Sequence, residues 1–247
     1  MKARARFLTA DWRYLAMLNY EMDPAPLRRW VPHGTELDTW NGKTFVSMVG
    51  FLFLNTKVRG VPVPFHRNFE EVNLRFYVRR KGDDGWRRGV VFVKEIVPRW
   101  AIAAVARLCY GERYAAMPMR HELELADGTI RESGRARYEW RHRGEWNHLT
   151  VRASGQPARP QPGSAEEFIT EHYWGYAAQR DGGAVEYRVE HPQWRVWQAA
   201  EAGLHCDAHA LYGAEFHEPL SGQPGSAFLA EGSAVTVRQG VALEEPC

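Results

Sequence analysis

The segment from Asn68 to Val78 constrains the fold of this chain more than any other. Read with the two-residue period of a β-strand, it separates into one apolar face and one polar face. The apolar face contains Val72, Leu74, Phe76 and Val78. The polar face contains Glu71, Asn73, Arg75 and Tyr77. Such a polar row is typical of a strand with one solvated face, which periodicity alone favours, but it would also suit the wall of a cavity that binds a small molecule.

The composition predicts an ordered globular protein without a strongly charged partner surface. Of the 247 residues, 45% are hydrophobic, and 32 basic residues nearly balance 30 acidic residues, which gives a formal charge of +2. This near balance provides no basic footprint for a nucleic acid and no polybasic patch for a membrane. Mixed sheets of this length often form one core, so we expect residues 1–247 to make a single domain.

No feature of the sequence predicts export or membrane insertion. There is no run of about 18 apolar residues, and Asp11 and Arg13 interrupt the apolar stretch that a signal peptide would need. The cysteines Cys109, Cys206 and Cys247 are odd in number and lack Cys-x-x-Cys spacing. Reduced thiols fit this pattern best, and we therefore expect a cytoplasmic protein.

The pattern of apolar residues predicts a chain rich in strands. We expect strands over 13–22, 44–55, 68–78, 90–97, 120–125, 129–142, 145–153, 185–190 and 194–202, and two more near Phe228 and Val235. The strand over 44–55 is apolar on both faces, which indicates a central strand covered on two sides. Helices are expected over 27–31, 98–110 and from Ser164 to about Ala178, and residues 156–163 read as an irregular loop.

Several short motifs, in this order, resemble the YqjF-like family, known as domain of unknown function 2071, which is distantly related to acetoacetate decarboxylase. The motifs are Trp12-Arg13-Tyr14, Val31-Pro32-His33-Gly34, Phe69-Glu70-Glu71-Val72-Asn73-Leu74-Arg75, Phe168-Ile169-Thr170-Glu171-His172-Tyr173 and His191-Pro192-Gln193-Trp194. The resemblance covers roughly residues 7–240 and implies an α+β fold: a mostly antiparallel, strongly curved sheet that closes into a cone-like barrel around a cavity, with a few peripheral helices. It implies no settled activity.

The resemblance carries two site residues over from the decarboxylases. These enzymes have an early arginine just before a tyrosine, followed by an acidic-proline turn, and Arg13 matches that substrate-site arginine. They also have a glutamate on a later strand, two positions after a tyrosine, and Glu71 matches that acid. A second site glutamate of the decarboxylases would fall within Val46–Phe51, which contains no acid.

The nucleophile of the decarboxylases has no counterpart in the matching segment. Those enzymes form a Schiff base through one of two adjacent lysines, and the corresponding segment here, Arg107–Pro118, contains no lysine. Arginine cannot replace it, because a guanidinium stays charged at any working pH. Lys94 is the one lysine within an apolar strand, where it would share a face with Phe92 and Ile96; a strand-end lysine with its ammonium in water is the simpler interpretation.

Alternative interpretations of the polar residues remain open at this stage. Glu71 could pair with Arg75 two positions along the same face, or act as an acid or base if it is buried. His205, Cys206, Asp207, His209 and His217 lie close in sequence, but their spacing matches no zinc signature, so no metal and no cofactor are expected. His172 and His191 are interpreted as packing and turn residues.

The leading hypothesis is a small-molecule protein on the decarboxylase-like scaffold, with a small organic acid as ligand. We expect Glu71 to be the catalytic acid or base, and expect the ligand to contact Arg13, Asn73, Arg75, Tyr77 and Tyr114. As an enzyme it would be a lyase or isomerase for an oxo- or hydroxy-acid, using enolisation, dehydration or isomerisation without a Schiff base. A non-catalytic binder or sensor is the alternative, and an interaction module acting through sheet edges ranks third. Assembly into identical copies is left open.

Overall fold

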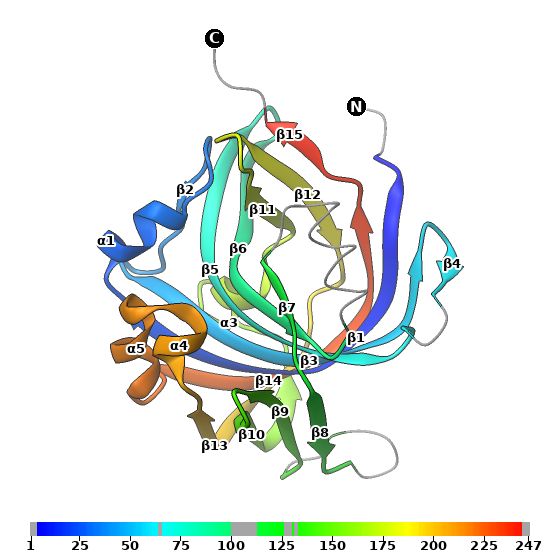
Figure 1. Ribbon diagram of the computed structural model, residues 1–247, viewed down its shortest axis with the longest axis vertical. Helices are drawn as coiled ribbons and strands as arrows, with labels where there is room; N and C mark the ends of the chain where they lie inside the picture. The colour runs from blue at the N-terminus through cyan, green and yellow to red at the C-terminus, as the bar shows by residue number, and fades with distance from the viewer. Residues whose placement is uncertain (1–3, 64–65, 100–112, 126–129, 131–132, 244–247) are drawn as a thin grey trace.

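The computed structural model describes residues 4–63, 66–99, 113–125, 130 and 133–243. All but the first two residues of the predicted helix over 98–110 lie outside these ranges, as does the predicted turn Asp127-Gly128. The described chain is dominated by one continuous sheet with a few short helices at its periphery (Figure 1). The predicted α+β class with a mostly antiparallel, strongly curved sheet is therefore confirmed.

The elements follow the chain from the N-terminus as a succession of long strands and short helices. The strands are β1 (Arg6–Met22), β2 (Glu36–Leu37), β3 (Thr44–Val58), β4 (Val61–Pro62), β5 (Phe69–Gly82), β6 (Gly85–Val97), β7 (Tyr114–Ala116), β8 (Met119–Leu123), β9 (Arg135–His142), β10 (Glu145–Ala158), β11 (Trp174–Ala178), β12 (Ala184–Glu190), β13 (Val196–His205), β14 (Ser226–Arg238) and β15 (Val241–Leu243). The helices are α1 (Pro24–Leu27), the 3-10 helix η1 (Arg28–Trp30), α3 (Ala165–Thr170), α4 (Ala208–Tyr212) and α5 (Ala214–Ser221).

The central strands close into a ring. Neighbouring strands pair in the order β14, β1, β3, β5, β6, β11 and β12, and β12 pairs in turn with β14 through Val189 opposite Val237 and Glu190 opposite Thr236. Within this ring only the β6–β11 contact is parallel. β13, β10, β9 and β8 continue the sheet from β14 and form the lower part of the view in Figure 1. Closure gives the barrel an inner and an outer face.

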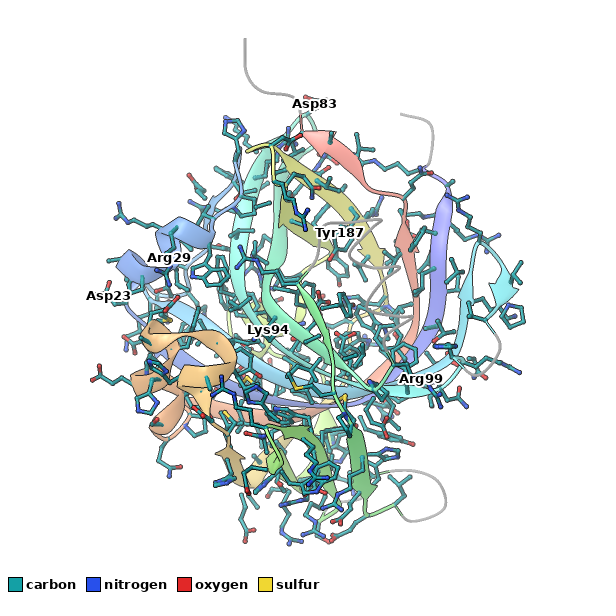
Figure 2. The ribbon with its side chains drawn as sticks, viewed as in Figure 1. Asp23, Arg29, Asp83, Lys94, Arg99 and Tyr187 are labelled. Carbon is teal, nitrogen blue, oxygen red and sulfur yellow. The ribbon has the colours of Figure 1, made fainter. Side chains whose placement is uncertain are left out.

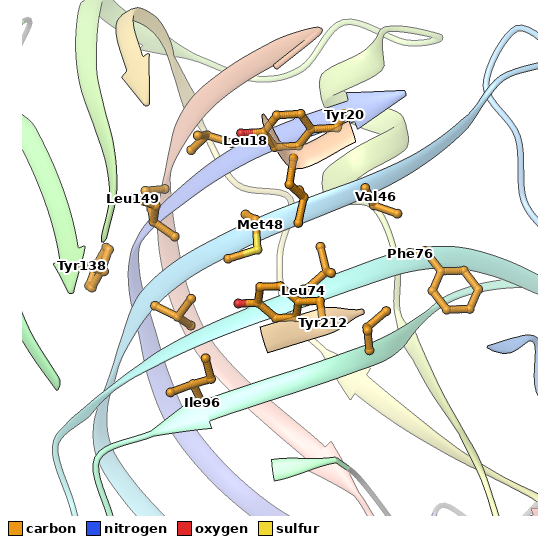
Figure 3. Packing of buried hydrophobic residues seen from close by; sticks show 14 of the residues in the cluster. Leu18, Tyr20, Val46, Met48, Leu74, Phe76, Ile96, Tyr138, Leu149 and Tyr212 are labelled. Atoms are coloured by element: carbon orange, nitrogen blue, oxygen red, sulfur yellow. The ribbon is translucent and has the colours of Figure 1, made fainter. Parts of the chain in front are cut away.

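The two faces of β5 confirm the period-2 reading of the sequence. Leu74 and Phe76 lie in the larger apolar cluster, on the outer face of the ring, together with Met48 of β3. The strands β9 and β10 and the helices α4 and α5 cover this outer face, and Figure 3 shows Leu149 and Tyr212 among the residues of the cluster. The inner face carries the polar row, so the polar residues of β5 point into the barrel and not toward solvent.

Several expectations about secondary structure are wrong, among them the start of the strand over 129–142, because β9 begins at Arg135. The predicted helix from Ser164 ends at Thr170, and Trp174–Ala178 is the strand β11. The amide of Val189 in β12 donates to the carbonyl of Tyr173, so pairing with β12 outweighs local helix propensity there. The two predicted C-terminal strands are one long strand, β14, and β10 extends to Ala158, beyond its predicted end and into the predicted loop.

A buried acid ties four strands of the ring to the N-terminal segment. Glu186 of β12 is fully buried and accepts hydrogen bonds from Arg87 at 2.8 Å, Arg4 at 3.1 Å and Tyr176 at 3.2 Å. Arg80 of β5 adds an ion pair at 3.4 Å. A buried carboxylate with this many donors is compensated for its loss of hydration, which makes the group structural.

Within the described residues, none of the helices is long and apolar enough to cross a membrane. The described part of the chain contains one cysteine, Cys206, which is a free thiol.

Gly50 of β3 lies where β9 packs on the outer face of the ring. A Cβ atom added to Gly50 would lie 2.7 Å from Cδ2 of Tyr138, a fully buried ring whose hydroxyl donates to the carbonyl of Tyr14. We expect Gly50→Ala to lower the free energy of unfolding by about 1–3 kcal/mol, the usual cost of overpacking. Denaturant titration measures this change.

Gly203→Ala in β13 is the matched control, because nothing lies within 4 Å of its added Cβ. This exposed strand glycine should tolerate alanine with no loss of stability. Equal stability of the two variants would contradict the close contact between Gly50 and Tyr138.

Candidate functional site

The barrel encloses a cavity of about 200 Å³. Its wall is mostly apolar and aromatic and includes several polar side chains. The polar and titratable residues of the wall are Thr56, His66, Glu71, Asn73, Arg75, Glu95, Tyr114, Thr170, His172, Tyr187 and His191. A small, largely apolar cavity with a few convergent polar groups is the usual form of a small-molecule site.

The inner face of β5 carries three polar residues of this wall, Glu71, Asn73 and Arg75. All three are buried: their exposed fractions are 2%, 2% and 9%. Because they alternate along one strand, adjacent members are two residues, or roughly 7 Å, apart. Four of the predicted site residues, these three and Tyr114, therefore line one cavity.

Glu71 is held by two donors at the cavity wall. The amide Nδ2 of Asn73 donates to Oε1 at 3.0 Å, and the hydroxyl of Tyr114 donates to Oε2 at 3.2 Å. Tyr114 reaches this position because β7 runs parallel to β6, with Tyr114 opposite Glu95. The Oδ1 atom of Asn73 is buried and has no hydrogen-bond partner among the described residues. A ligand that donates a hydrogen bond would satisfy this oxygen.

Arg75 is a buried cation without an acidic partner in the described part of the chain. Its Nη2 atom donates to the carbonyl of Ile169 at 3.3 Å and lies 4.0 Å from the sulfur of Met17. Its Nε atom has no partner among the described residues. A buried charge costs several kcal/mol unless it is paired, so this guanidinium is suited to an anionic ligand.

His172 forms the neighbouring part of the wall and is buried against Phe168 and Tyr77, with ring centroids at 5.5 and 4.6 Å. Its Nε2 atom lies 3.6 Å from Oδ2 of Asp38, which is longer than a hydrogen bond. Asp38 accepts a 2.7 Å hydrogen bond from Arg88. Both ring nitrogens of His172 lack a hydrogen-bond partner in the described residues.

Burial lowers the pKa of His172 to about 4. Asp38 opposes this shift, whereas the charges of Arg88 and Arg75 add to it. The imidazole is therefore neutral near pH 7, and it can accept one hydrogen bond and donate another. Burial also lowers the pKa of His191, which stacks on Trp194 with centroids 4.2 Å apart.

Aromatic rings form the wall beyond Glu71. Phe53 and Phe69 are stacked at 4.7 Å, and Trp12 meets Phe51 and Phe53 edge-on at 5.4 and 5.6 Å. Trp194 lies 6.4 Å from Trp12. These rings form a mostly apolar side of the cavity, in which the indole Nε1 of Trp12 is a buried donor without a hydrogen-bond partner among the described residues.

Tyr187 of β12 also lines the cavity, and Figure 2 labels it on that strand. Its ring lies over Gly175 of the neighbouring strand β11. A Cβ atom added to Gly175 would lie 2.1 Å from Cζ of Tyr187, so the ring occupies the space that a side chain there would need.

Arg13 does not line this cavity in the described structure. The register of β1 shifts between Arg13 and Ala16, and Tyr14 adopts a positive φ of 57°. This bulge lets both Trp12 and Leu15 face the cavity. Arg13 instead donates to the carbonyl of Gly232 at 3.4 Å and is half-buried.

Tyr77 also lies outside the described lining. Its hydroxyl is 2.6 Å from the hydroxyl of Ser47, which donates to Asn19 at 2.6 Å. Its ring packs behind His172. Tyr77 thus supports the wall of the cavity, although it belongs to the polar face of β5.

A second bulge corrects the predicted position of Lys94. Leu74 lies opposite Lys94, but the next residue, Arg75, lies opposite Phe92, so one residue of β6 is unmatched. Phe92 and Glu95 therefore line the cavity, and Lys94 points to the outer face, where it donates to the carbonyl of Leu211. The expectation that Lys94 shares a face with Phe92 is wrong, and no lysine lines the cavity in the described residues.

The sequence did not predict seven polar wall residues: Thr56, His66, Glu95, Thr170, His172, Tyr187 and His191. Strict alternation along β6 would put Glu95 and Phe92 on opposite faces of the strand. The bulge puts both on the inner face, and the sequence pattern does not show it. His172 and His191 reach the cavity from the segments after α3 and β12, and only the three-dimensional pairing reveals this.

No group of three or more His, Cys, Asp or Glu side chains gathers as a metal site within the described ranges. Of the histidines near the C-terminus, His205 stacks on His148 across β10 and β13, with centroids 5.3 Å apart, and His209 packs against His217.

Comparison with known sequences supports the resemblance drawn from the motifs. The family model DUF2071, described as an uncharacterized conserved protein, matches residues 9–234. The chain is 28% identical over 207 residues to the uncharacterized protein YqjF of Bacillus subtilis (strain 168), a match that covers 81% of this chain and 80% of YqjF. The predicted family is confirmed.

Comparison with solved structures identifies the fold. Acetoacetate decarboxylase from Legionella pneumophila is similar with a TM-score of 0.68 and 15% identity, over 97% of this chain and 88% of that one. The enduracididine biosynthesis enzyme MppR complexed with pyruvate gives a TM-score of 0.67 and 13% identity, over 99% and 92%. The acetoacetate decarboxylase-like fold is therefore confirmed.

The buried imidazole of His172 should make stability depend on pH. Its pKa is about 4 in the folded protein and about 6.5 in the unfolded chain, so the unfolded chain binds the proton more readily. The contribution of His172 is fully present above pH 6.5 and is lost as the pH falls toward 4. We expect wild type to lose about 3 kcal/mol more than His172→Gln between pH 7 and 4, measured by urea titration.

His33→Gln is the control, because His33 is exposed. This variant should follow the wild-type pH profile. A His172→Gln profile that parallels wild type throughout would show that the imidazole is not held neutral by burial.

Proposed function

The chain belongs to the DUF2071 family, and we propose that it binds a small carboxylic acid in its barrel cavity and acts on that acid by proton transfer. The class that fits best is a lyase or isomerase for a small oxo- or hydroxy-acid. Two structural neighbours support the class of ligand: one is an acetoacetate decarboxylase, and the other is complexed with pyruvate.

The observation that carries the proposal is the buried guanidinium of Arg75. It faces the cavity, is 9% exposed, and has no acidic partner among the described residues. In a cavity of low polarity, an uncompensated cation is costly and its attraction for an anion is strong. A carboxylate would accept hydrogen bonds from Nε and from the terminal nitrogens, which is the pairing that guanidinium geometry favours. In this proposal Arg75 binds the carboxylate of the ligand, in place of Arg13, which the resemblance matched to the substrate-site arginine of the decarboxylases.

Glu71 is proposed as the group that moves the proton. Glu71 lies on the same face of β5 as Asn73 and Arg75, and all three line the cavity. Asn73 and Tyr114 both donate to Glu71, which favours its charged, basic form. In enolisation, Glu71 would take a proton from the carbon next to the carbonyl. The C–H electron pair would form the C=C bond, the C=O π pair would move onto the oxygen, and a hydrogen-bond donor would stabilise the enolate.

A Schiff base is not part of the proposed reaction. The segment that carries the decarboxylase lysines has none here, and Lys94 donates to the carbonyl of Leu211 on the outer face. Proton transfer by Glu71 requires no covalent intermediate, so the wall residues suffice.

A non-catalytic binder or sensor is the alternative. It would use the same Arg75 clamp, with Glu71 serving only to hydrogen-bond the ligand. The two functions differ in turnover and not in the class of ligand.

Removal of the Arg75 charge should abolish binding. We expect pyruvate or another small carboxylic, oxo- or hydroxy-acid, at about ten times its Kd, to raise the Tm of wild type by about 3–6 °C. Arg75→Met, which keeps much of the side-chain length, should show no rise. Differential scanning fluorimetry measures both.

Arg13→Met is the matched control, since Arg13 lies outside the cavity lining. It should keep the wild-type shift. Loss of the shift in Arg13→Met with retention in Arg75→Met would reverse the assignment of the clamp.

Glu71→Gln should separate the enzyme from the binder. Hydrogen–deuterium exchange next to the carbonyl of the acid identified by the screen can be followed by NMR in D₂O. We expect wild type to accelerate exchange and Glu71→Gln to reduce the acceleration about 100-fold or more, with the Tm shift retained. Wild type that binds the acid without accelerating exchange would favour the non-catalytic binder.

A further inference from the structure

We propose that the acid bound by this cavity carries a planar aromatic substituent, and that its ring lies against Phe69, Phe53 and Trp12. This inference rests on the proposed carboxylate site, and it specifies the other end of the ligand.

Strand register orders the cavity residues of β5 along one line of the barrel wall, which runs from Arg75 to the rings of the proposed aromatic site. On β5 the cavity residues follow in the order Arg75, Asn73, Glu71 and Phe69. Phe53 of β3 lies opposite Phe69, and Trp12 of β1 lies opposite Phe53. Across these strands the wall therefore passes from the guanidinium of Arg75 to the rings of Phe69, Phe53 and Trp12.

The aromatic end offers the geometry that a further ring requires. Phe53 and Phe69 are nearly parallel, with an interplanar angle of 11°, and Trp12 stands at 73° to Phe53. Stacked and edge-to-face contacts are the favourable arrangements of aromatic pairs, and this cluster presents both. A ligand ring among them would extend the cluster instead of leaving its inner side against water.

The apolar wall continues beyond these rings to the edge of the cavity. Leu8, Val58, Val63 and Val237 line that part together with Thr56 and His66. An apolar group of the ligand gains there by leaving water. A pyruvate-sized acid at Arg75 would leave this part unfilled, because about 200 Å³ is the liquid volume of about seven waters.

A series of acids with one head group tests the proposal. Propanoate, 3-phenylpropanoate and 3-cyclohexylpropanoate share a carboxylate and carry no reactive carbonyl, so their Kd values report binding alone. We expect 3-phenylpropanoate to bind about 10- to 100-fold more tightly than propanoate, from the burial of the ring. It should bind about 2- to 10-fold more tightly than the cyclohexyl acid, from ring–ring contacts. Isothermal titration calorimetry gives these values.

Phe69→Leu tests the location of the ring. The advantage of the phenyl acid over the cyclohexyl acid should fall to about 2-fold or less, and the Kd of propanoate should stay unchanged. Phe45→Leu is the matched control, because Phe45 packs against Phe168 outside the cavity lining. Its Kd values should equal those of wild type. Because Phe69→Leu replaces a buried ring and lowers stability, nuclear Overhauser contacts between the phenyl protons and Trp12 in the wild-type protein provide an independent measure of ring position.

The outcomes separate this inference from the proposed function. Equal affinity for propanoate and the phenyl acid, both dependent on Arg75, would overturn the aromatic substituent and leave the carboxylate site standing. A cyclohexyl acid that binds as tightly as the phenyl acid would also overturn it. Tight binding of the phenyl acid that persists in Arg75→Met would overturn the carboxylate site and leave the aromatic site standing. Binding of none of the three acids would overturn both.

Discussion

The pairing of β12 with β14 is the contact on which the rest of the structure depends. Two residue pairs, Val189 with Val237 and Glu190 with Thr236, join strands that are otherwise at opposite ends of the path around the ring. Arg238 reinforces this seam with a 2.9 Å ion pair to Glu190. Without closure, the inner face of β5 would be an open sheet surface and its polar row would be solvated. Closure converts that row into a cavity wall. Away from bulk water, the charged and polar groups of these residues attract a ligand more strongly than they would in solvent.

Two buried charges illustrate how the barrel separates structure from function. Glu186 is surrounded by three arginines and a tyrosine, so its charge is satisfied within the protein. Arg75 lies on the inner face with a backbone carbonyl, a thioether and, at 5.8 Å, the ring of Tyr77 as neighbours, and no acid pairs with it in the described ranges. A fold optimised only for stability would neutralise Arg75 in the same way. The contrast favours a ligand as the missing partner.

Alternation along β5 predicted Glu71, Asn73 and Arg75 of the cavity wall, because it is a property of a single strand. The short motifs predicted the family, and the resemblance to that family implied the curved sheet. The sequence misplaced Arg13 and Lys94, since a β-bulge shifts every following side chain to the other face and leaves no mark in the hydrophobic pattern. It extended the helix after Ser164 into β11, where pairing with β12 decides the conformation. His172 and His191 could not be placed in the cavity wall from the sequence, since both lie in connecting segments that only the closed ring brings to the cavity.

The seating of Tyr187 over Gly175 has an evolutionary consequence. The tyrosine ring occupies the space that a side chain on the neighbouring strand would fill, so the side chains at positions 175 and 187 compete for the same volume. A larger residue at position 175 requires a smaller one at position 187, and the exchange would move volume from one strand to the other while the backbone stays in place. Because Tyr187 lines the cavity, relatives that made this exchange would enclose a cavity of different shape on the same barrel. The pair is thus a point at which ligand preference can diverge without any change of fold.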